Sequence, residues 1–157
     1  MSVVVPTPTN RVHCVECPLR ALSAFRPFSG EELEFVAAFK RGEFSSEAGS
    51  TILSEGAHSP HLFTLLSGWA FRFKTLSDGR RQILNYILPG DLVGLQGSLL
   101  GEMRHAVEAL TPVVLCVFQR DRIAELYRCH PGLGFDVTWL ASREERMLDE
   151  NLLSLGR

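Results

Sequence analysis

The sequence predicts a mainly β protein with flanking helices: an antiparallel jelly roll (a double-stranded β-helix) followed by one long helix. Between Glu43 and Phe118, short apolar runs alternate with glycine-containing turns, which is typical of antiparallel barrels and jelly rolls. After Phe118 the spacing of apolar residues changes to three or four, as in amphipathic helices. The chain has 157 residues, 45% of them apolar and 22% charged, which is enough for one domain with an ordinary core.

Charge and hydropathy exclude several classes of protein. The 16 Lys and Arg residues against 18 Asp and Glu argue against a stand-alone nucleic-acid binder, although not against one part of a larger binder. The longest apolar run, Val113 to Phe118, is far shorter than the roughly 20 residues that span a bilayer. Pro6 and Pro8 interrupt the N-terminal valines and no basic region precedes them, so we expect no signal peptide and a cytoplasmic protein without membrane contact. In that compartment the four cysteines are thiols or metal ligands.

We divide the chain into an N-terminal arm with a cysteine pair (1–28), a jelly roll with flanking helices (29–130) and a long helix (131–157). The jelly-roll segment begins with a predicted amphipathic helix from Ser29 to Lys40. Ser29 is a suitable N-cap, Glu32 follows three residues later as in a capping box, and Gly42 comes after the end.

One strand and its hairpin are well marked in the middle of the chain. From Trp69 to Lys74, aromatic residues occupy every second position, which predicts a strand whose aromatic face alone is buried. Asp78-Gly79 supplies the backbone freedom for a hairpin turn, and Arg80-Arg81 begins the return strand.

The last part of the chain is predicted to be helical. A short helix from Arg122 to Arg128 ends before Pro131-Gly132, and a long amphipathic helix follows, its apolar stripe interrupted by Glu144. A helix this long with a narrow stripe needs a partner, and a second copy of the chain is favoured over packing on the barrel. The predicted dimer contacts are Leu133, Val137, Leu140, Met147, Leu148, Leu152 and Leu155.

Several segments occur in the order and spacing of one superfamily. They are Gly68-Trp69, Asp78 to Gln82, Leu88-Pro89-Gly90-Asp91-Leu92-Val93-Gly94 and Ala109-Leu110. Together they resemble the sensory domain of the Crp/Fnr transcription regulators, a cyclic-nucleotide-binding jelly roll followed by a dimerisation helix. The resemblance covers residues 13–157, and its cysteines point to the Fnr-like branch, which senses oxygen or redox state.

The resemblance implies a homodimeric transcription regulator rather than an enzyme. In the family a winged helix-turn-helix domain follows the dimerisation helix and binds palindromic promoter DNA. This sequence stops at Arg157, so we expect DNA binding only through such a domain, which the chain lacks. Arg80 and Arg81, at an exposed hairpin, are candidate contacts to RNA polymerase.

The resemblance also implies a candidate ligand site. A cyclic nucleotide needs backbone N–H groups from a glycine-rich turn, a carboxylate for the ribose and an arginine for the phosphate. Gly90, Asp91, Gly94 and Arg104 are the candidates. However, nucleotide binders of the family have the longer Glu in place of Asp91, and Ser or Thr in place of His105. These departures favour a plain barrel turn, and we do not expect a cyclic nucleotide.

An iron–sulfur cluster is the cofactor that the Fnr-like resemblance implies. Cys14, Cys17 and Cys116 match the places of its cysteine ligands, but the third N-terminal cysteine is missing. Two alternatives remain: a thiol switch or other metal site, or no redox role, with Cys116 a buried core thiol. Candidates for a fourth ligand are His13, Glu16 and Cys129.

Two other functions compete with the regulator. One is a small-molecule-binding jelly-roll module whose ligand lies behind Gly90 to Gly94. The other is a cupin-like metalloenzyme, which needs a histidine cluster in the barrel and has only His58, His61 and His105 to supply it. A surface loop explains His58 and His61 better.

Overall fold

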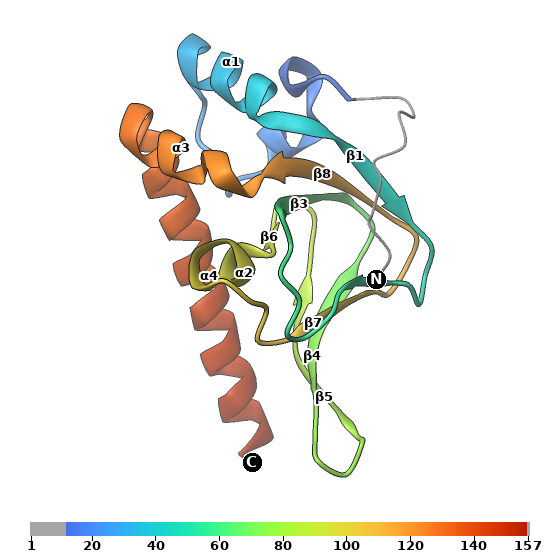
Figure 1. Ribbon diagram of the computed structural model, residues 1–157. Coiled ribbons are helices and arrows are strands. Elements are labelled where there is room, and N and C mark those ends of the chain that lie inside the picture. The colour runs from blue at the N-terminus through green and yellow to red at the C-terminus, as the bar shows by residue number, and fades with distance from the viewer. Residues whose placement is uncertain (1–11, 157) are drawn as a thin grey trace.

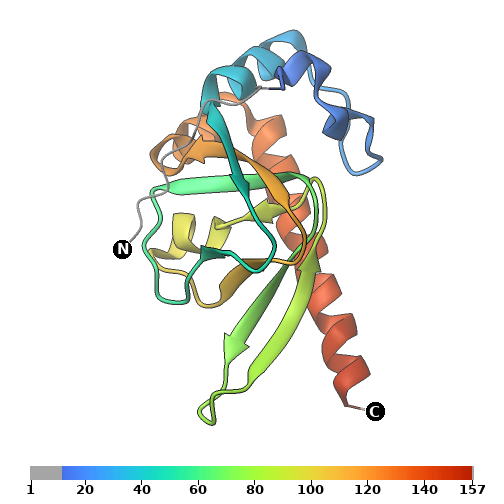
Figure 2. The ribbon, with the colours of Figure 1, turned by 90° about the vertical axis from the view of Figure 1, so that its right-hand side faces the viewer.

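The computed structural model describes residues 12–156, in which eight antiparallel strands form two four-stranded sheets (Figures 1 and 2). The strands are β1 (Lys40–Ser46), β2 (Thr51–Leu53), β3 (His61–Ser67), β4 (Ala70–Thr75), β5 (Arg81–Ile87), β6 (Leu92–Val93), β7 (Ala106–Ala109) and β8 (Val113–Gln119). One sheet has the order β1-β8-β3-β6 and the other β2-β7-β4-β5. The predicted jelly roll is confirmed.

Helices cover one end and one side of this barrel. They are the 3-10 helices η1 (Cys14–Glu16), η2 (Pro18–Ala21) and η3 (Arg120–Arg122), and the α-helices α1 (Gly30–Phe39), α2 (Leu95–Leu100), α3 (Ile123–Cys129) and α4 (Pro131–Leu155). Figure 1 shows α1 and α3 above the barrel, with α4 running along its side past α2. Within residues 12–156, no helix combines the length and apolar character that crossing a membrane requires.

Apolar side chains from both sheets form one core. Leu65 and Leu115 come from one sheet and Ala70 and Ile87 from the other, and all four are fully buried. A second cluster joins Phe39 of α1, Leu126 of α3 and Leu133 of α4. The jelly roll and the helices that flank it are therefore packed together through separate apolar contacts.

The start of α1 is as predicted, and its end differs. Ser29 Oγ accepts a hydrogen bond from Glu32 N at 3.1 Å, and Ser29 N donates to Glu32 Oε2 at 2.9 Å, which completes the capping box. The helix ends at Phe39, and Lys40, predicted as helical, begins β1 opposite Phe118. Burial of Phe39 against α3 and α4, together with the pairing of β1 with β8, overrides the helical spacing.

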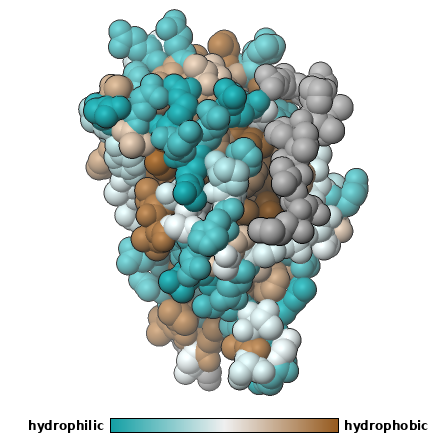
Figure 3. All heavy atoms as spheres, in the orientation of Figure 1, coloured by the Kyte–Doolittle hydropathy of each residue, from teal (hydrophilic) through white to brown (hydrophobic). Residues whose placement is uncertain are grey.

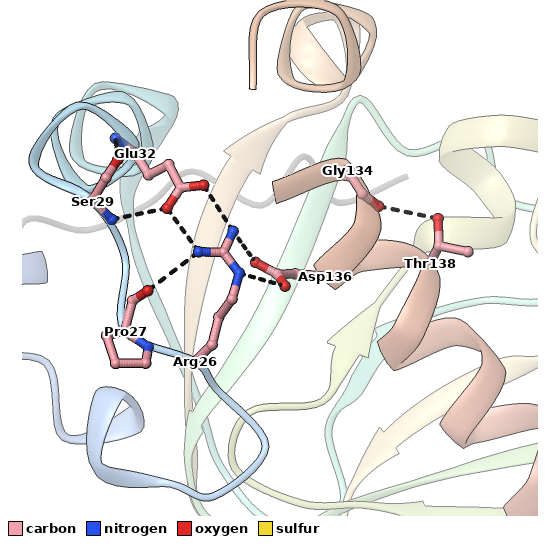
Figure 4. A network of polar contacts seen from close by, with 7 residues as sticks. All are labelled: Arg26, Pro27, Ser29, Glu32, Gly134, Asp136 and Thr138. Carbon is pink, nitrogen blue, oxygen red and sulfur yellow. Dashed lines mark hydrogen bonds and ion pairs between the residues drawn. The ribbon is translucent and has the colours of Figure 1, made fainter. Parts of the chain in front are cut away.

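Arg26 joins the start of α1 to the first turns of α4 (Figure 4). Its guanidinium donates to both carboxylate oxygens of Glu32, at 2.9 and 2.7 Å, and Nε donates to Asp136 Oδ1 at 3.0 Å. Gly132 lies against this network: a Cβ there would be 2.8 Å from both Arg26 Nη2 and Glu32 Oε1. A larger residue at position 132 would therefore displace the ion pairs.

The prediction that β4 buries only its aromatic face is wrong. Phe71 and Phe73 are buried on one face, where the Arg81 guanidinium lies 4.4 Å from the Phe73 ring centroid. Ala70 and Arg72, on the other face, are also buried. Local contacts bury the aromatic face of β4. The opposite face points into the barrel interior, which places Arg72 inside the protein.

Candidate functional site

Three of the four cysteines line one cavity of about 110 Å³, which we call the cysteine cavity. Cys14 comes from η1, Cys17 lies between η1 and η2, and Cys116 comes from β8. Lys40, at the start of β1, also lines it, and most of the remaining wall is apolar. The sequence prediction that these three cysteines belong together agrees with their placement here.

Packing of η2 holds the cysteine pair against the sheet. Pro18 begins η2, and Leu19 is buried in one apolar cluster with Leu66 and Cys116. Cys17 packs against the same cluster. Because Leu19 follows Cys17 by two residues, its burial brings that thiol to β8.

A buried ion pair lies beside the cavity. Lys40 Nζ donates to Glu43 Oε1 at 2.6 Å, and both side chains are almost fully covered. Burial raises the pKa of the Cys116 thiol to about 12, although the Lys40 charge opposes the shift. Burial also raises the pKa of Cys14, again opposed by Lys40. Both thiols are therefore protonated at neutral pH.

Besides the three thiols, the polar side chains that line the cavity are Arg20, Lys40 and Thr64. The candidates for a fourth ligand lie elsewhere: His13, Glu16 and Cys129 are exposed and do not line the cavity. Among the side chains of residues 12–156, no group of three or more His, Cys, Asp or Glu has the geometry to hold a single metal ion. The described residues that line the cavity supply three thiols and no fourth Cys, His, Asp or Glu, so a cluster held by four protein ligands would be one ligand short.

A second cavity, of about 290 Å³, lies between the barrel, α2 and α4, and we call it the barrel–helix pocket. Its walls are mostly apolar. Arg72, His105 and Glu144 supply charged or titratable groups, from β4, the residue before β7 and α4 respectively. Burial, together with the nearby charge of Arg72, lowers the pKa of His105 to about 4, so that this imidazole is neutral at pH 7.

Arg72 connects both sheets and α4 from inside the pocket. Across the β4–β5 ladder it faces Asn85, and its Nη1 donates to Asn85 Oδ1 at 3.1 Å. Nη2 donates to the Leu92 carbonyl of β6 at 2.6 Å and lies 3.2 Å from Glu144 Oε2 of α4. Sequence reasoning did not assign these residues to a site. The one signal in the sequence was Glu144, which interrupts an apolar stripe, whereas Arg72 lies on the strand face that was expected to be exposed.

The four residues predicted to bind a nucleotide are not brought together. Gly94 lines the barrel–helix pocket, whereas Asp91 accepts a hydrogen bond from Leu88 N at 2.8 Å within its own turn. Arg104 is exposed and pairs with Glu102 at 3.0 Å. A Cβ at Gly90 would lie 2.9 Å from the Phe25 ring, so the absence of a side chain there serves packing. These contacts favour the plain-turn interpretation.

The histidines considered for a cupin-type site are also apart. His105 lines the barrel–helix pocket, while His58 and His61 border a separate surface hollow beside Arg120. In the part of the chain that the structure describes, these three histidines therefore form no cluster inside the barrel.

The apolar stripe of α4 divides between two environments. Leu133 is buried within its own chain, which corrects its assignment to a dimer interface, and Val137 packs partly against the same cluster. Leu148 lines the barrel–helix pocket. Leu140 and Met147 are half-buried, and Leu152 and Leu155 are exposed.

A different face of α4 carries further exposed apolar side chains. Phe135, Trp139 and Leu153 lie at heptad-like spacings, and among residues 12–156 no apolar cluster packs against them. Figure 3 shows hydrophobic side chains among polar ones over the lower part of the molecule, where α4 ends. Sequence reasoning missed this face because the stripe that packs on the barrel dominates the pattern.

Comparisons with known proteins identify the family of the jelly roll. The profile of the cyclic nucleotide-binding domain family matches residues 43–130. The chain is 32% identical over 157 residues to the nitrogen fixation regulation protein FixK of Bradyrhizobium diazoefficiens, covering 99% of this chain and 64% of that protein. It is 30% identical to the transcriptional activator protein FnrL of Cereibacter sphaeroides, covering 98% of this chain and 60% of that protein.

Solved structures share the fold of this chain. FixK2 from Bradyrhizobium japonicum superimposes with a TM-score of 0.66 at 28% identity, over 73% of this chain and 57% of that one. The catabolite activator protein of Thermus thermophilus superimposes with a TM-score of 0.69 at 23% identity, over 85% of this chain and 62% of that one. The chain spans about three fifths of the length of the curated relatives named above. It belongs to the cyclic nucleotide-binding domain family, as a domain of the Crp/Fnr type with its C-terminal helix.

Proposed function

We propose that this chain is the redox-sensing and dimerisation domain of a Crp/Fnr-type DNA-binding transcription regulator. The observation that carries the redox part is the cysteine cavity, because three of four cysteines from separate segments line one small space. The regulator part is supported by the family match and by relatives named as a regulation protein and a transcriptional activator.

The chemistry that suits this cavity is reversible disulfide formation. Cys17 and Cys116 are the preferred pair, since both belong to the apolar cluster around Leu19. A peroxide would first oxidise the Cys17 thiol to a sulfenic acid and itself become an alcohol, and the sulfenic acid would then condense with the Cys116 thiol to form the disulfide and release water. A cytoplasmic thiol reductant would reverse the step.

A disulfide there would act on a segment that reaches α4. The bond would fix the η1–η2 segment to β8. A few residues later, Ser23 and Arg26 line a surface hollow together with Phe135 and Trp139 of α4. A change at Cys17 can therefore alter the position of the helix through which we propose that two copies associate.

The remaining partners are proposals for the complete regulator. Promoter DNA would be bound by a helix-turn-helix domain following α4, in two copies. Arg80 and Arg81 of the β4–β5 hairpin stay candidates for contact with RNA polymerase. Both are exposed and paired, Arg80 with Asp78 at 2.7 Å and Arg81 with Glu108 at 2.8 Å.

Peptide mapping tests the redox proposal. The wild-type chain is treated with peroxide, alkylated without reductant and digested, and we expect a Cys17–Cys116 disulfide that a thiol reductant removes. Cys17→Ser and Cys116→Ser should abolish it, while Cys129→Ser, at an exposed thiol outside the cavity, should not. A chain that stays fully reduced, or pairs only through Cys129, contradicts the proposal.

Anaerobic iron analysis separates this mechanism from the iron–sulfur alternative. Protein purified without oxygen should contain no stoichiometric iron and no visible absorption if thiol chemistry alone operates. Iron that is lost on Cys14→Ser would replace the disulfide mechanism with a cluster whose fourth ligand comes from outside the thiol set.

A small-molecule module is the second candidate, and the size of the barrel–helix pocket favours it. Calorimetry with several cyclic nucleotides tests this function. Heat of binding in the wild-type chain would support the small-molecule module. We expect no heat of binding with cyclic nucleotides, because Asp91 and Arg104 are engaged outside the pocket.

A further inference from the structure

The barrel–helix pocket contains a positive charge that is almost completely shielded from water. The Arg72 side chain is 4% exposed, and its neutral partners are the Asn85 amide and the Leu92 carbonyl. Neither of these groups neutralises a guanidinium. A buried arginine in an apolar-walled cavity normally requires an anion, either from a ligand or from the protein.

In this chain the anion is supplied by α4. Glu144 Oε2 lies 3.2 Å from Arg72 Nη2, at the edge of the pocket. Glu144 stands in the apolar stripe of α4, where an uncharged residue would pack on the barrel more easily. The cost of placing it there is visible in its pKa, which burial raises despite the opposing effect of Arg72.

We propose that Glu144 is a built-in ligand of the barrel–helix pocket: its carboxylate occupies the anion position beside Arg72, anchors α4 to the barrel and excludes external anions. This inference concerns the ligand specificity of the pocket and does not depend on the cysteine chemistry proposed above. If this chain does not bind cyclic nucleotides, as the sequence predicts, the Glu144 carboxylate supplies a physical reason.

The charges around Arg72 support exclusion of external anions. An incoming phosphate or carboxylate would meet Glu144 next to the guanidinium, with Glu145 on the same wall and the negative field of Asp91 acting on the same position. Two anions competing for one buried guanidinium repel each other strongly in a low-dielectric cavity. Removing the Glu144 carboxylate reverses this situation, because no other carboxylate among residues 12–156 forms an ion pair with Arg72.

The test is chemical rescue of Glu144→Ala. This substitution removes the atoms of one acetate ion, so acetate should bind in the space left beside Arg72. We expect a saturable rise in the melting temperature of Glu144→Ala with sodium acetate, compared with sodium chloride at equal ionic strength. The wild-type chain should show no difference between the two salts.

Two controls make the result specific. Glu145→Ala removes a neighbouring carboxylate of the same pocket wall and should gain no response to acetate. In the double variant Arg72→Met with Glu144→Ala, the acetate response should be lost. If Glu144→Ala does not fold, Glu144→Ser takes its place with the same two salts, because it also removes the carboxylate and leaves its space empty.

The outcomes are distinct. A folded Glu144 variant with no specific anion response overturns the proposal, and so does a wild-type chain that acetate stabilises equally. Calorimetry adds a second measurement: a cyclic nucleotide that binds the wild-type chain as tightly as Glu144→Ala also overturns it.

Discussion

Arg72 of β4 and Glu144 of α4 are 72 residues apart in sequence, and their side chains meet at 3.2 Å inside the barrel–helix pocket. The same guanidinium also donates hydrogen bonds to the Asn85 side chain and to the Leu92 carbonyl. One side chain thus ties together two sheets and the long helix. The orientation of α4 therefore depends on a polar contact as well as on apolar packing.

A double-mutant cycle should show this coupling. We expect Arg72→Met and Glu144→Gln each to lower the free energy of unfolding by about 1–3 kcal/mol, because each leaves a largely buried polar partner unmatched. The double variant should be destabilised by less than the sum of the two, with a coupling of at least about 1 kcal/mol. Urea unfolding followed by circular dichroism measures all four proteins. Strict additivity would mean that the two groups do not stabilise each other.

His105 should make stability depend on pH in mildly acidic solution. Its pKa is lowered in the fold to about 4 from 6.5. Between these values the unfolded chain binds a proton that the folded chain does not, so stability falls as the pH decreases from 6.5 to 4. The loss amounts to at most about 3 kcal/mol. Unfolding free energies of wild type and His105→Asn across this range provide the check, and equal slopes would contradict the assignment.

The sequence predicted most of the fold from local signals. Ser29 and Glu32 form a capping box because both partners lie within one turn, and glycine-rich turns delimit the strands of the jelly roll. The end of α1 was not predictable in this way. Lys40 continues the helical spacing, but it pairs with Phe118, a residue far away in sequence. Tertiary contacts decide such boundaries.

Part of the candidate sites could be predicted from the sequence, namely where the residue type and its position both match the family to which the resemblance points. Cys14, Cys17 and Cys116 were recognised as a group, and they line one cavity. Arg72 and Glu144 were not, because each reads as a solvent-exposed charge until the fold brings the two together. A buried ion pair between distant segments leaves only an interrupted apolar pattern in the sequence.

Cys116 should be the least reactive thiol of the folded chain. With a pKa of about 12, it has roughly a thousandfold less thiolate at pH 8 than a thiol of pKa 9. We expect iodoacetamide to modify Cys116 about a thousandfold more slowly in the folded chain than in urea. Mass spectrometry of timed digests gives both rates. A folded rate close to the rate in urea would show that burial does not suppress ionisation.

Arg26 should contribute to stability through the contacts in Figure 4. Arg26→Ala removes the hydrogen bonds to Glu32 and Asp136, and because the arginine side chain is partly exposed we expect a loss of only about 1 kcal/mol. Gly132→Ala should have a similar effect, since its Cβ would press on the same groups. Denaturant unfolding measures both, and two variants as stable as wild type would show that the network is dispensable.

Two exposed faces of α4 are alternative candidates for the contact between two copies of the chain. Leu152 and Leu155 continue the stripe predicted from sequence, but that stripe packs on the barrel earlier in the helix. Phe135, Trp139 and Leu153 follow a heptad spacing on another face and remain exposed. We expect the second face to form the dimer contact.

Leu153→Glu and Leu155→Glu form a matched pair that decides between these faces. The two side chains are almost equally exposed, at 66% and 64%, and they point about 200° apart around the helix. A glutamate at the dimer contact would bring two like charges together and bury them, so Leu153→Glu should give a monomer by light scattering. Leu155→Glu should leave the dimer intact, because position 155 faces away from this contact. A monomer produced by Leu155→Glu alone would instead support the dimer contact first predicted from the sequence, through the stripe that contains Leu152 and Leu155.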